Sequence, residues 1–276
     1  MKKIKKNIQS SATYLLISKP NHYLKKLFLK TILIGFITIS LIVIMHFFEL
    51  ESIKIPSTMH SLIGIVIGLL LVFRTTTAYE RWWEGRKTIG LLSAEVGILS
   101  SKIDVLKNEN NKEKTIYLKK CIENFLTDLS NYLELSDNGQ ESKSFHLSQK
   151  VKIQKSAIAL RDIELDNSYY QSIDNSLYKM LEFSNSLERI KNTPIPLSYV
   201  LHIKVSIMIY LMTLPFGLFH DLGIWATPIV MVVYYIIAGV EIISNEIENP
   251  FAGEPNDLPV KKLFSSMIDT LLDKKN

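Results

Sequence analysis

Cysteine is nearly absent from this sequence, and the motifs of common enzyme families are missing. Among 276 residues there is one cysteine, Cys121. A single cysteine excludes an internal disulfide and a metal site built from several thiolates. No GxxxxGK[ST], HExxH or GxSxG motif is present, and the six histidines show no paired ligand spacing. The sequence therefore predicts no enzyme activity, no metal site and no cofactor.

Acidic residues are absent from the first 30 positions, which hold eight lysines. These eight charges exceed the net charge of the whole chain, which is +5 at pH 7. A nucleic-acid-binding domain carries its basic residues on the face that meets the phosphates, whereas here they are concentrated at one end of the chain. We therefore expect no nucleic-acid partner, and we interpret residues 1–30 as a separate basic N-terminal segment.

Charged residues are almost absent from four long apolar runs. Hydrophobic residues make up 47% of the chain while 21% is charged, which suggests a chain divided between two solvents. A membrane helix needs about 20 apolar residues, or about 17 at the short end. The four runs cover residues 31–48, 55–73, 205–219 (with 201–204 before it) and 222–240. We expect an all-α integral membrane protein in a lipid bilayer, with transmembrane helices 1 and 2 within residues 31–80 and helices 3 and 4 within 200–243.

The basic residues that flank these runs predict the orientation. Eight lysines precede the first run, and four basic residues follow the second between positions 74 and 87. The segments that join the runs in pairs, 49–60 and 220–223, together contain one lysine. Because loops rich in lysine and arginine stay in the cytoplasm, both termini are expected there. A signal peptide is the alternative for the first run, but this run starts late, is long and lacks a small-residue cleavage site.

Residues 81–199 are expected to form a helical cytoplasmic region, and residues 244–276 a cytoplasmic C-terminal segment. Apolar residues at positions 89, 92, 96, 99, 103 and 106 are spaced as in a helix that packs on a partner. Positions 118, 122, 125 and 129 continue this pattern, and a third helix is expected around residues 173–190. Pro194 and Pro196 then end the third helix. Residues 107–114 and 134–144 are interpreted as polar links between helices.

Several residues near the end of the second run are candidates for helix packing. Trp82 and Trp83 lie beside basic residues, Arg81 and Arg86, and an indole ring can stack on a guanidinium group to lock one helix against a neighbour. Arg74 marks the point where the helix is expected to leave the membrane. Within the run, a GxxxG pair would let another helix approach closely; its members are Gly64 and Gly68.

Three apolar residues of the second run, Ile65, Leu69 and Phe73, share one face of the predicted helix because they are four residues apart. The whole helix is apolar, so spacing alone leaves open whether this face meets lipid, protein or a pore. Packing is the commoner role of such a face.

Three segments resemble signature regions of the bestrophin family, in its branch of short bacterial homologues. They read FRTTTAYERWWEGRKTIG (73–90), RIKNTPIPLSYVLHIKV (189–205) and EIENPFAGEPNDLP (246–259), and they occur in the family's order. The resemblance implies a homopentameric ion channel of the bacterial inner membrane, with one central pore that continues into a helical cytoplasmic vestibule. The implied partners are other copies of the chain, the lipid bilayer and permeant monovalent ions.

The resemblance also assigns residues to the pore. Three rings of apolar side chains would form its narrow neck, and they fall on Ile65, Leu69 and Phe73. A second, cytoplasmic constriction falls near Ser168 and Tyr169, where the family usually has an aliphatic residue. This sequence departs from the family there. Animal relatives bind calcium beside the NPF motif through a dense run of acids, whereas only Glu254 and Asp257 are close here, so we expect no calcium gating through this segment.

The permeant ion and the role itself leave alternatives. Animal bestrophins are anion channels, while the bacterial branch is associated with monovalent cations, so a cation such as Na⁺ is favoured and an anion channel of the same architecture is the alternative. Acidic residues after the fourth run, Glu241 and Glu248, share a face with Asn245. A non-conducting scaffold that recruits a cytoplasmic partner is a further alternative, and a transporter would need more polar groups at mid-bilayer.

Overall fold

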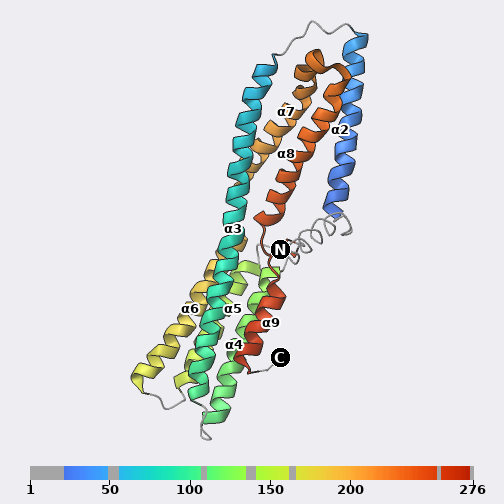
Figure 1. Cartoon of the computed structure of the whole chain (residues 1–276). Helices are drawn as coiled ribbons and strands as arrows, with labels where there is room; N and C mark the ends of the chain where they lie inside the picture. The colour runs from blue at the N-terminus through green and yellow to red at the C-terminus, as the bar shows by residue number, and fades with distance from the viewer. Residues whose placement is uncertain are drawn as a thin grey trace, which may run out of the picture. The chain divides into compact units, whose positions relative to one another are not determined.

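The computed structural model describes residues 22–48, 56–106, 111–134, 141–161, 166–253 and 256–273. These residues are helical apart from short connections, and no strand occurs among them (Figure 1). The all-α prediction is therefore confirmed. The chain divides into two compact units: the first unit comprises Met1–Thr75 and Leu197–Ile243, and the second comprises Thr76–Pro196 and Ser244–Asn276.

The first unit contains the apolar helices. They are α2 (His22–Phe47), the beginning of α3 (Ser57–Val105), α7 (Leu197–Leu222), the short 3₁₀ helix η3 (Gly223–Trp225) and α8 (Ala226–Glu248) as far as Ile243. A small buried cluster joins α3 to α7, and α8 residues pack against it. Gly35 of α2 lies so close to Met231 of α8 that an added Cβ would stand 2.7 Å from its sulfur. Close helix contacts at small residues are typical of membrane proteins, where apolar helices gain little from leaving lipid.

Three helical stretches among the described residues have the length and composition to cross a membrane. They are Leu27–Phe47, Thr58–Val105 and Leu197–Glu248. The third stretch contains both the third and the fourth apolar runs, and η3 divides it into α7 and α8. Gly223 begins η3 with a φ of 55°, a left-handed conformation that glycine adopts without strain. Pro228 lies in the first turn of α8, where its missing N–H has no intrahelical partner to lose.

Helix α3 is much longer than the apolar run at its beginning. It comprises 49 residues without a break, which corresponds to about 74 Å at 1.5 Å per residue. The hydrocarbon core of a bilayer is about 30 Å thick, so less than half of α3 fits inside it. The remainder belongs to the second unit from Thr76 onward.

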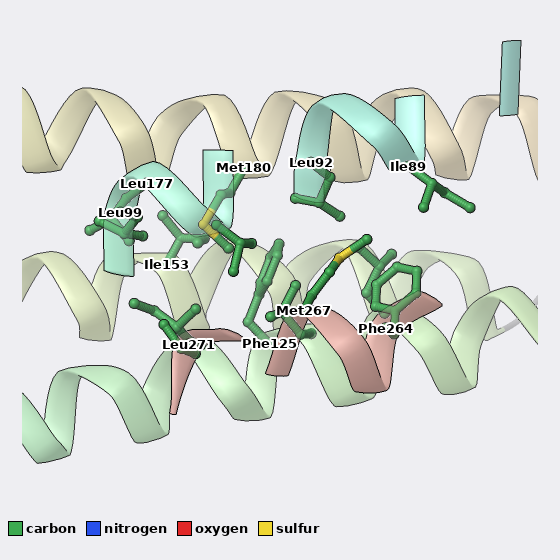
Figure 2. Packing of buried hydrophobic residues seen from close by; sticks show 14 of the residues in the cluster. Ile89, Leu92, Leu99, Phe125, Ile153, Leu177, Met180, Phe264, Met267 and Leu271 are labelled. Atoms are coloured by element: carbon green, nitrogen blue, oxygen red, sulfur yellow. The ribbon is translucent and has the colours of Figure 1, made fainter. Parts of the chain in front are cut away.

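The second unit is a bundle of amphipathic helices. The end of α3 packs with α4 (Lys112–Glu134), α5 (Glu141–Arg161), α6 (Asn167–Asn192) and α9 (Val260–Leu271). Figure 2 shows side chains from these helices pointing into one core, among them Leu99, Phe125, Ile153 and Phe264. Every predicted seam residue is buried there, which confirms the expected helix contacts; they are Ile89, Leu92, Val96, Leu99, Ile103, Leu106, Leu118, Ile122, Phe125 and Leu129.

Helix α6 begins earlier than the expected start near residue 173, and it ends where the sequence predicts. Its N-cap is Asp166, whose carboxylate accepts hydrogen bonds from the backbone N–H of Ser168, at 3.3 Å, and from its hydroxyl. These bonds hold the pKa of Asp166 below its usual value. The helix ends at Asn192, before the two prolines.

Two helices of the second unit were not predicted. The link expected at 134–144 is wrong from Glu141, where α5 begins; residues 135–140 lie outside the described residues. The buried seam of α5 alternates apolar and polar residues, namely Gln149, Ile153, Ser156 and Leu160, so half of its hydrophobic signal is missing. In contrast, α9 buries apolar residues at each seam position. Its 4, 3, 4 spacing was available in the sequence.

Replacing Leu99 by alanine tests the importance of this core. Leu99 is fully buried among α3, α4 and α6 neighbours, whereas Leu91 of the same helix is exposed. Leu99→Ala is expected to lower the unfolding free energy of the second unit by about 2 to 5 kcal/mol, because it removes buried methyl groups and leaves a cavity. Leu91→Ala is the matched control. Thermal unfolding of the detergent-solubilised protein measures both, and equal changes in the two variants would contradict the assignment of the core.

Candidate functional site

The part of α3 in the first unit has two opposite faces. One face is buried against α7 through Ile67 and Leu71, which contact Ile203 and Ile207 in the same cluster. The other face carries the predicted neck residues. Ile65, Leu69 and Phe73 are 70%, 54% and 55% exposed in the single chain. At 100° per residue these three side chains lie about half a turn from Ile67 and Leu71.

The exposed residues of α3 are apolar from Leu62 to Phe73, whereas Thr58 and Ser61 before them are polar. Other exposed residues of this helix, such as Met59 and Val66, are apolar too. Exposure in one chain is compatible with lipid, with a neighbouring copy or with a pore, so the neck assignment stays a prediction. The face available to an assembly is nevertheless defined, because α7 occupies the opposite one.

The two glycines of the GxxxG pair have different surroundings. A Cβ added at Gly64 would stand 2.9 Å from the hydroxyl oxygen of Tyr210, so this glycine lets α7 of the same chain approach α3. At Gly68 an added Cβ would meet no atom within 4 Å. The pair therefore does not act as one contact within the chain, and a role of Gly68 between subunits stays a prediction.

Buried polar side chains also lie on the packed face of α3. His60 is buried, and its Nε2 lies 2.9 Å from the backbone carbonyl oxygen of Thr213, to which it donates as the N–H tautomer. Arg74 is buried as well, although it was expected where the helix leaves the membrane for water. The apolar pattern of the run gave no sign that these polar groups face inward.

Arg81 binds the carbonyl ends of two helices in the second unit. Its Nε donates to the carbonyl of Glu248, the last residue of α8, at 2.7 Å. Its two terminal nitrogens donate to the carbonyls of Ile190 and Thr193, at the end of α6. The last carbonyls of a helix lack intrahelical donors and carry partial negative charge, so a guanidinium group satisfies both needs.

Burial lowers the pKa of Arg81, and the nearby carboxylates of Glu248 and Glu84 oppose this shift. The group stays protonated, as arginine does in proteins generally. Glu84, one turn further along α3, also pairs with Arg189 of α6 at 3.2 Å. Each partner in that pair is largely exposed, so the pair adds little stability.

The two tryptophans have different surroundings within the chain. Trp82 stacks on Tyr79, with ring centroids 6.3 Å apart, and its Nε1 donates to the carbonyl of Asn256 at 3.3 Å. Trp83 and Arg86 are exposed. The N–H groups of Arg81 bind helix-end carbonyls, and the stacking of an indole on its guanidinium face stays a prediction. Contacts of Trp83 or Arg86 with another subunit stay predictions.

Gly85 of α3 lies against the NPF motif. A Cβ at this position would stand 3.2 Å from the ring of Phe251 and 3.4 Å from Leu258. Phe251 is buried, and the backbone N–H of Leu258 donates to the carbonyl of Pro250 at 3.0 Å. The motif thus forms a turn that docks the C-terminal segment on α3, as expected. Glycine inside a helical pattern was the available signal of this close approach.

The acids near the NPF motif do not form a metal-binding cluster among the described residues. Among the described residues, no group of three His, Cys, Asp or Glu side chains is placed to hold a metal ion. Glu254, one of the two acids beside the motif, lies outside the described residues. The absence of calcium gating stays a prediction.

The residues predicted for the cytoplasmic constriction lie at the start of α6. The hydroxyl of Tyr169 donates to the carbonyl of Lys102 at 2.9 Å, and its ring packs at the edge of the core. Ser168 is exposed and bonded to Asp166. Within one chain, Tyr169 is thus a packing residue of the second unit, and a constriction at these positions stays a prediction.

The acids after the fourth run have partners within the chain. Glu241 pairs with Lys204 of α7, with 3.4 Å between Oε1 and Nζ. Glu248 is buried, beside the Arg81 guanidinium that binds its backbone carbonyl. Because these carboxylates face cations of the same chain, their charge toward a passing ion is partly compensated.

Replacing Arg81 by lysine tests the helix-end contact. Lysine keeps the charge but loses the planar set of donors that reaches three carbonyls, and each lost charged hydrogen bond costs about 1.5 to 3 kcal/mol. We expect Arg81→Lys to lower the thermal stability of the purified protein clearly. Arg86→Lys, an exposed position on the same helix, is the matched control. Equal melting temperatures of the two variants would show that the Arg81 contacts are dispensable.

Comparisons with known proteins agree with the fold and the motifs. The voltage-dependent anion channel-forming protein alr2987 of Nostoc sp. is 34% identical over 228 residues, covering 74% of this chain and 73% of its own length. The protein of the same description from Synechocystis sp., sll1024, is 33% identical over 236 residues, or 76% of this chain and 75% of its own. YneE of Salmonella typhimurium, with the same description, is 27% identical over 90% of this chain and 86% of its own.

A solved bacterial bestrophin homologue from Klebsiella pneumoniae has the same fold, with a TM-score of 0.79 and 21% identity over 89% of this chain and 97% of its own. The family model described as Bacterial/Fungal Bestrophin protein matches residues 3–273. The chain therefore belongs to the bestrophin family, in its bacterial and fungal branch.

Proposed function

We propose that this chain forms an ion channel, as a homopentamer around a pore lined by α3. The observation that carries the proposal is the apolar face of Ile65, Leu69 and Phe73, which is exposed in the single chain and opposite to the face packed on α7. Relatives that are 34% and 33% identical are named channel-forming proteins, and this supports the assignment. An enzyme is not supported by the family or by these relatives.

The proposed neck would control the passage of ions through the hydration of its interior. Five copies of each neck residue would surround the axis with three apolar rings. An ion must keep water or replace it with polar ligands, and an apolar ring offers none. A narrow neck therefore sheds water and blocks ions, while a wider neck stays wet and passes them. No charged side chain is needed at this position.

The proposed topology places four helices in the bilayer of the inner membrane: α2, the beginning of α3, α7 and α8. The second unit and both termini are cytoplasmic. The lysines before α2 and the basic residues after Phe73 support this orientation. Ser168, exposed at the start of α6, and the neighbouring Tyr169 are proposed to border a second constriction in the cytoplasmic part of the pore.

Different observations favour cation selectivity and anion selectivity. The resemblance to short bacterial bestrophins favours monovalent cations such as Na⁺, whereas the names of the relatives given above favour anions. The described acids do not decide between them, because Glu241 and Glu248 face Lys204 and Arg81. The charge selectivity therefore depends on the residues that line the pore of the assembly.

Shortening the neck residues tests the pore assignment. Leu69→Ala and Phe73→Ala widen the proposed apolar rings, so we expect leak conductance to rise several-fold in planar bilayers or liposomes. Ile63→Ala is the matched control, since Ile63 is exposed on the same helix but lies about a third of a turn from the neck face. Currents that stay unchanged in both neck variants would place this face against lipid or protein.

The subunit number is tested by mass. Native mass spectrometry of the detergent-solubilised complex is expected to give five times the 31.6 kDa of one chain. A monomer or dimer under mild detergent would remove the axial pore.

The ion itself is tested by reversal potential. Across a KCl gradient, a cation channel reverses near the K⁺ equilibrium potential and an anion channel near that of Cl⁻. We expect one of these two values for the wild-type pore. Purified protein that passes no Na⁺, K⁺ or Cl⁻ in liposomes would instead support the scaffold alternative.

A further inference from the structure

The first unit contains a cavity of about 590 Å³ between α2, α7 and α8. Its wall is apolar over most of its length and includes Ile37 of α2, Met208 and Phe216 of α7, and Ala238 of α8. A volume of this size, lined by apolar side chains with few polar groups, is typical of a site for a small ligand. The neck residues of α3 do not line it.

Two charged residues stand at one end of this cavity. Lys204 and Glu241 are the only ones of its lining residues with formal charge, and their side chains are 44% and 18% exposed. Between Lys204 and Phe216, twelve residues further along α7, the cavity extends for about 18 Å. Charged side chains near the end of a membrane-spanning stretch reach the interface, where they can meet the polar headgroup of a lipid.

The length of the cavity and the charges at its end match a lipid. The length of about 18 Å is close to half of the hydrocarbon core, about 15 Å, which is the depth that one lipid tail spans. An apolar wall with charged groups at one end corresponds to one hydrocarbon chain below its headgroup.

We propose that this cavity binds one acyl chain of a zwitterionic phospholipid with an ethanolamine headgroup, in the cytoplasmic leaflet. The headgroup phosphate would meet the ammonium group of Lys204, and the headgroup ammonium would meet the carboxylate of Glu241. Opposite charges 3.4 Å apart match a headgroup that carries both signs, and a lysine ammonium is a common phosphate ligand. The proposal depends on the proposed membrane topology, but it does not require that the protein conduct ions.

Photo-crosslinking in the complete, reconstituted protein tests this site. The probe is phosphatidylethanolamine with a diazirine in the middle of one acyl chain, and mass spectrometry locates the adducts. We expect adducts on the lining of α2, α7 and α8. Ala238→Trp fills the cavity and should reduce these adducts at least tenfold. Val232→Trp is the matched control, because Val232 lies on the same helix, is exposed and does not line the cavity.

The headgroup is tested separately by competition with phosphatidylglycerol. Glu241→Gln is expected to remove the preference for the ethanolamine headgroup, and Lys204→Gln to weaken labelling by either lipid several-fold. Labelling that Ala238→Trp and Val232→Trp reduce equally, or adducts spread evenly over the exposed helix faces, would overturn the lipid site. Crosslinks from the cavity to a second copy of the chain would overturn it as well.

The experiment separates failure of this site from failure of the channel. Labelling does not depend on current, so a non-conducting complex with cavity adducts keeps the lipid site and removes the channel. A conducting complex without cavity adducts would keep the channel and remove the lipid site.

Discussion

The contact of Arg81 with the ends of two helices is the interaction on which the second unit depends. Helices α6 and α8 end in carbonyl groups that have no donor of their own, and the guanidinium of α3 supplies three N–H groups to them. A hydrogen bond to a charged group contributes about 1.5 to 3 kcal/mol, which is a large share of the stability of a domain. These carbonyls lie at the ends of two helices from different parts of the chain. One arginine side chain therefore holds both helix ends against α3.

The close approach at Gly85 complements this contact one turn further along α3. Phe251 follows the end of α8, so the polar contact of Arg81 and the apolar contact of Phe251 hold the same region of the chain. Trp82 adds a bond to the carbonyl of Asn256. The signature motif that contains these residues therefore binds helix ends and the C-terminal turn within the second unit.

Much of the fold follows from regular spacing. The seam of α3 in the second unit and the core of α4 have an apolar residue at each contact position, and these helices were predicted correctly. Helix α5 was not, because Gln149 and Ser156 occupy two of its four buried positions and weaken the periodic signal. Spacing also grouped Ile65, Leu69 and Phe73 on one face, but it contains no information about what lies beyond that face.

The contacts of individual side chains were less predictable than the helices. Arg81 and Trp82 were predicted to pack between helices; within the chain they bind carbonyls of segments that the sequence does not bring together by spacing, and Trp82 also stacks on Tyr79 of its own helix. Tyr169 likewise bonds to a carbonyl of α3, a group that every residue carries and that no residue pattern identifies. Polar contacts to backbone depend on where helices end in space, and only the folded chain defines that.

The uninterrupted course of α3 also restricts how the second unit tolerates insertions and deletions. One residue added between Gly85 and Ile89 would turn everything after it by about 100°, so the contacts of Arg81 and Gly85 before it and the buried seam after it would lose their angular relation. Seven added residues make almost two full turns and would restore that angle to within about 20°, but they would move the two sets of contacts about 10 Å apart along the axis. The number of residues between these contacts is therefore restricted by the geometry of one continuous helix.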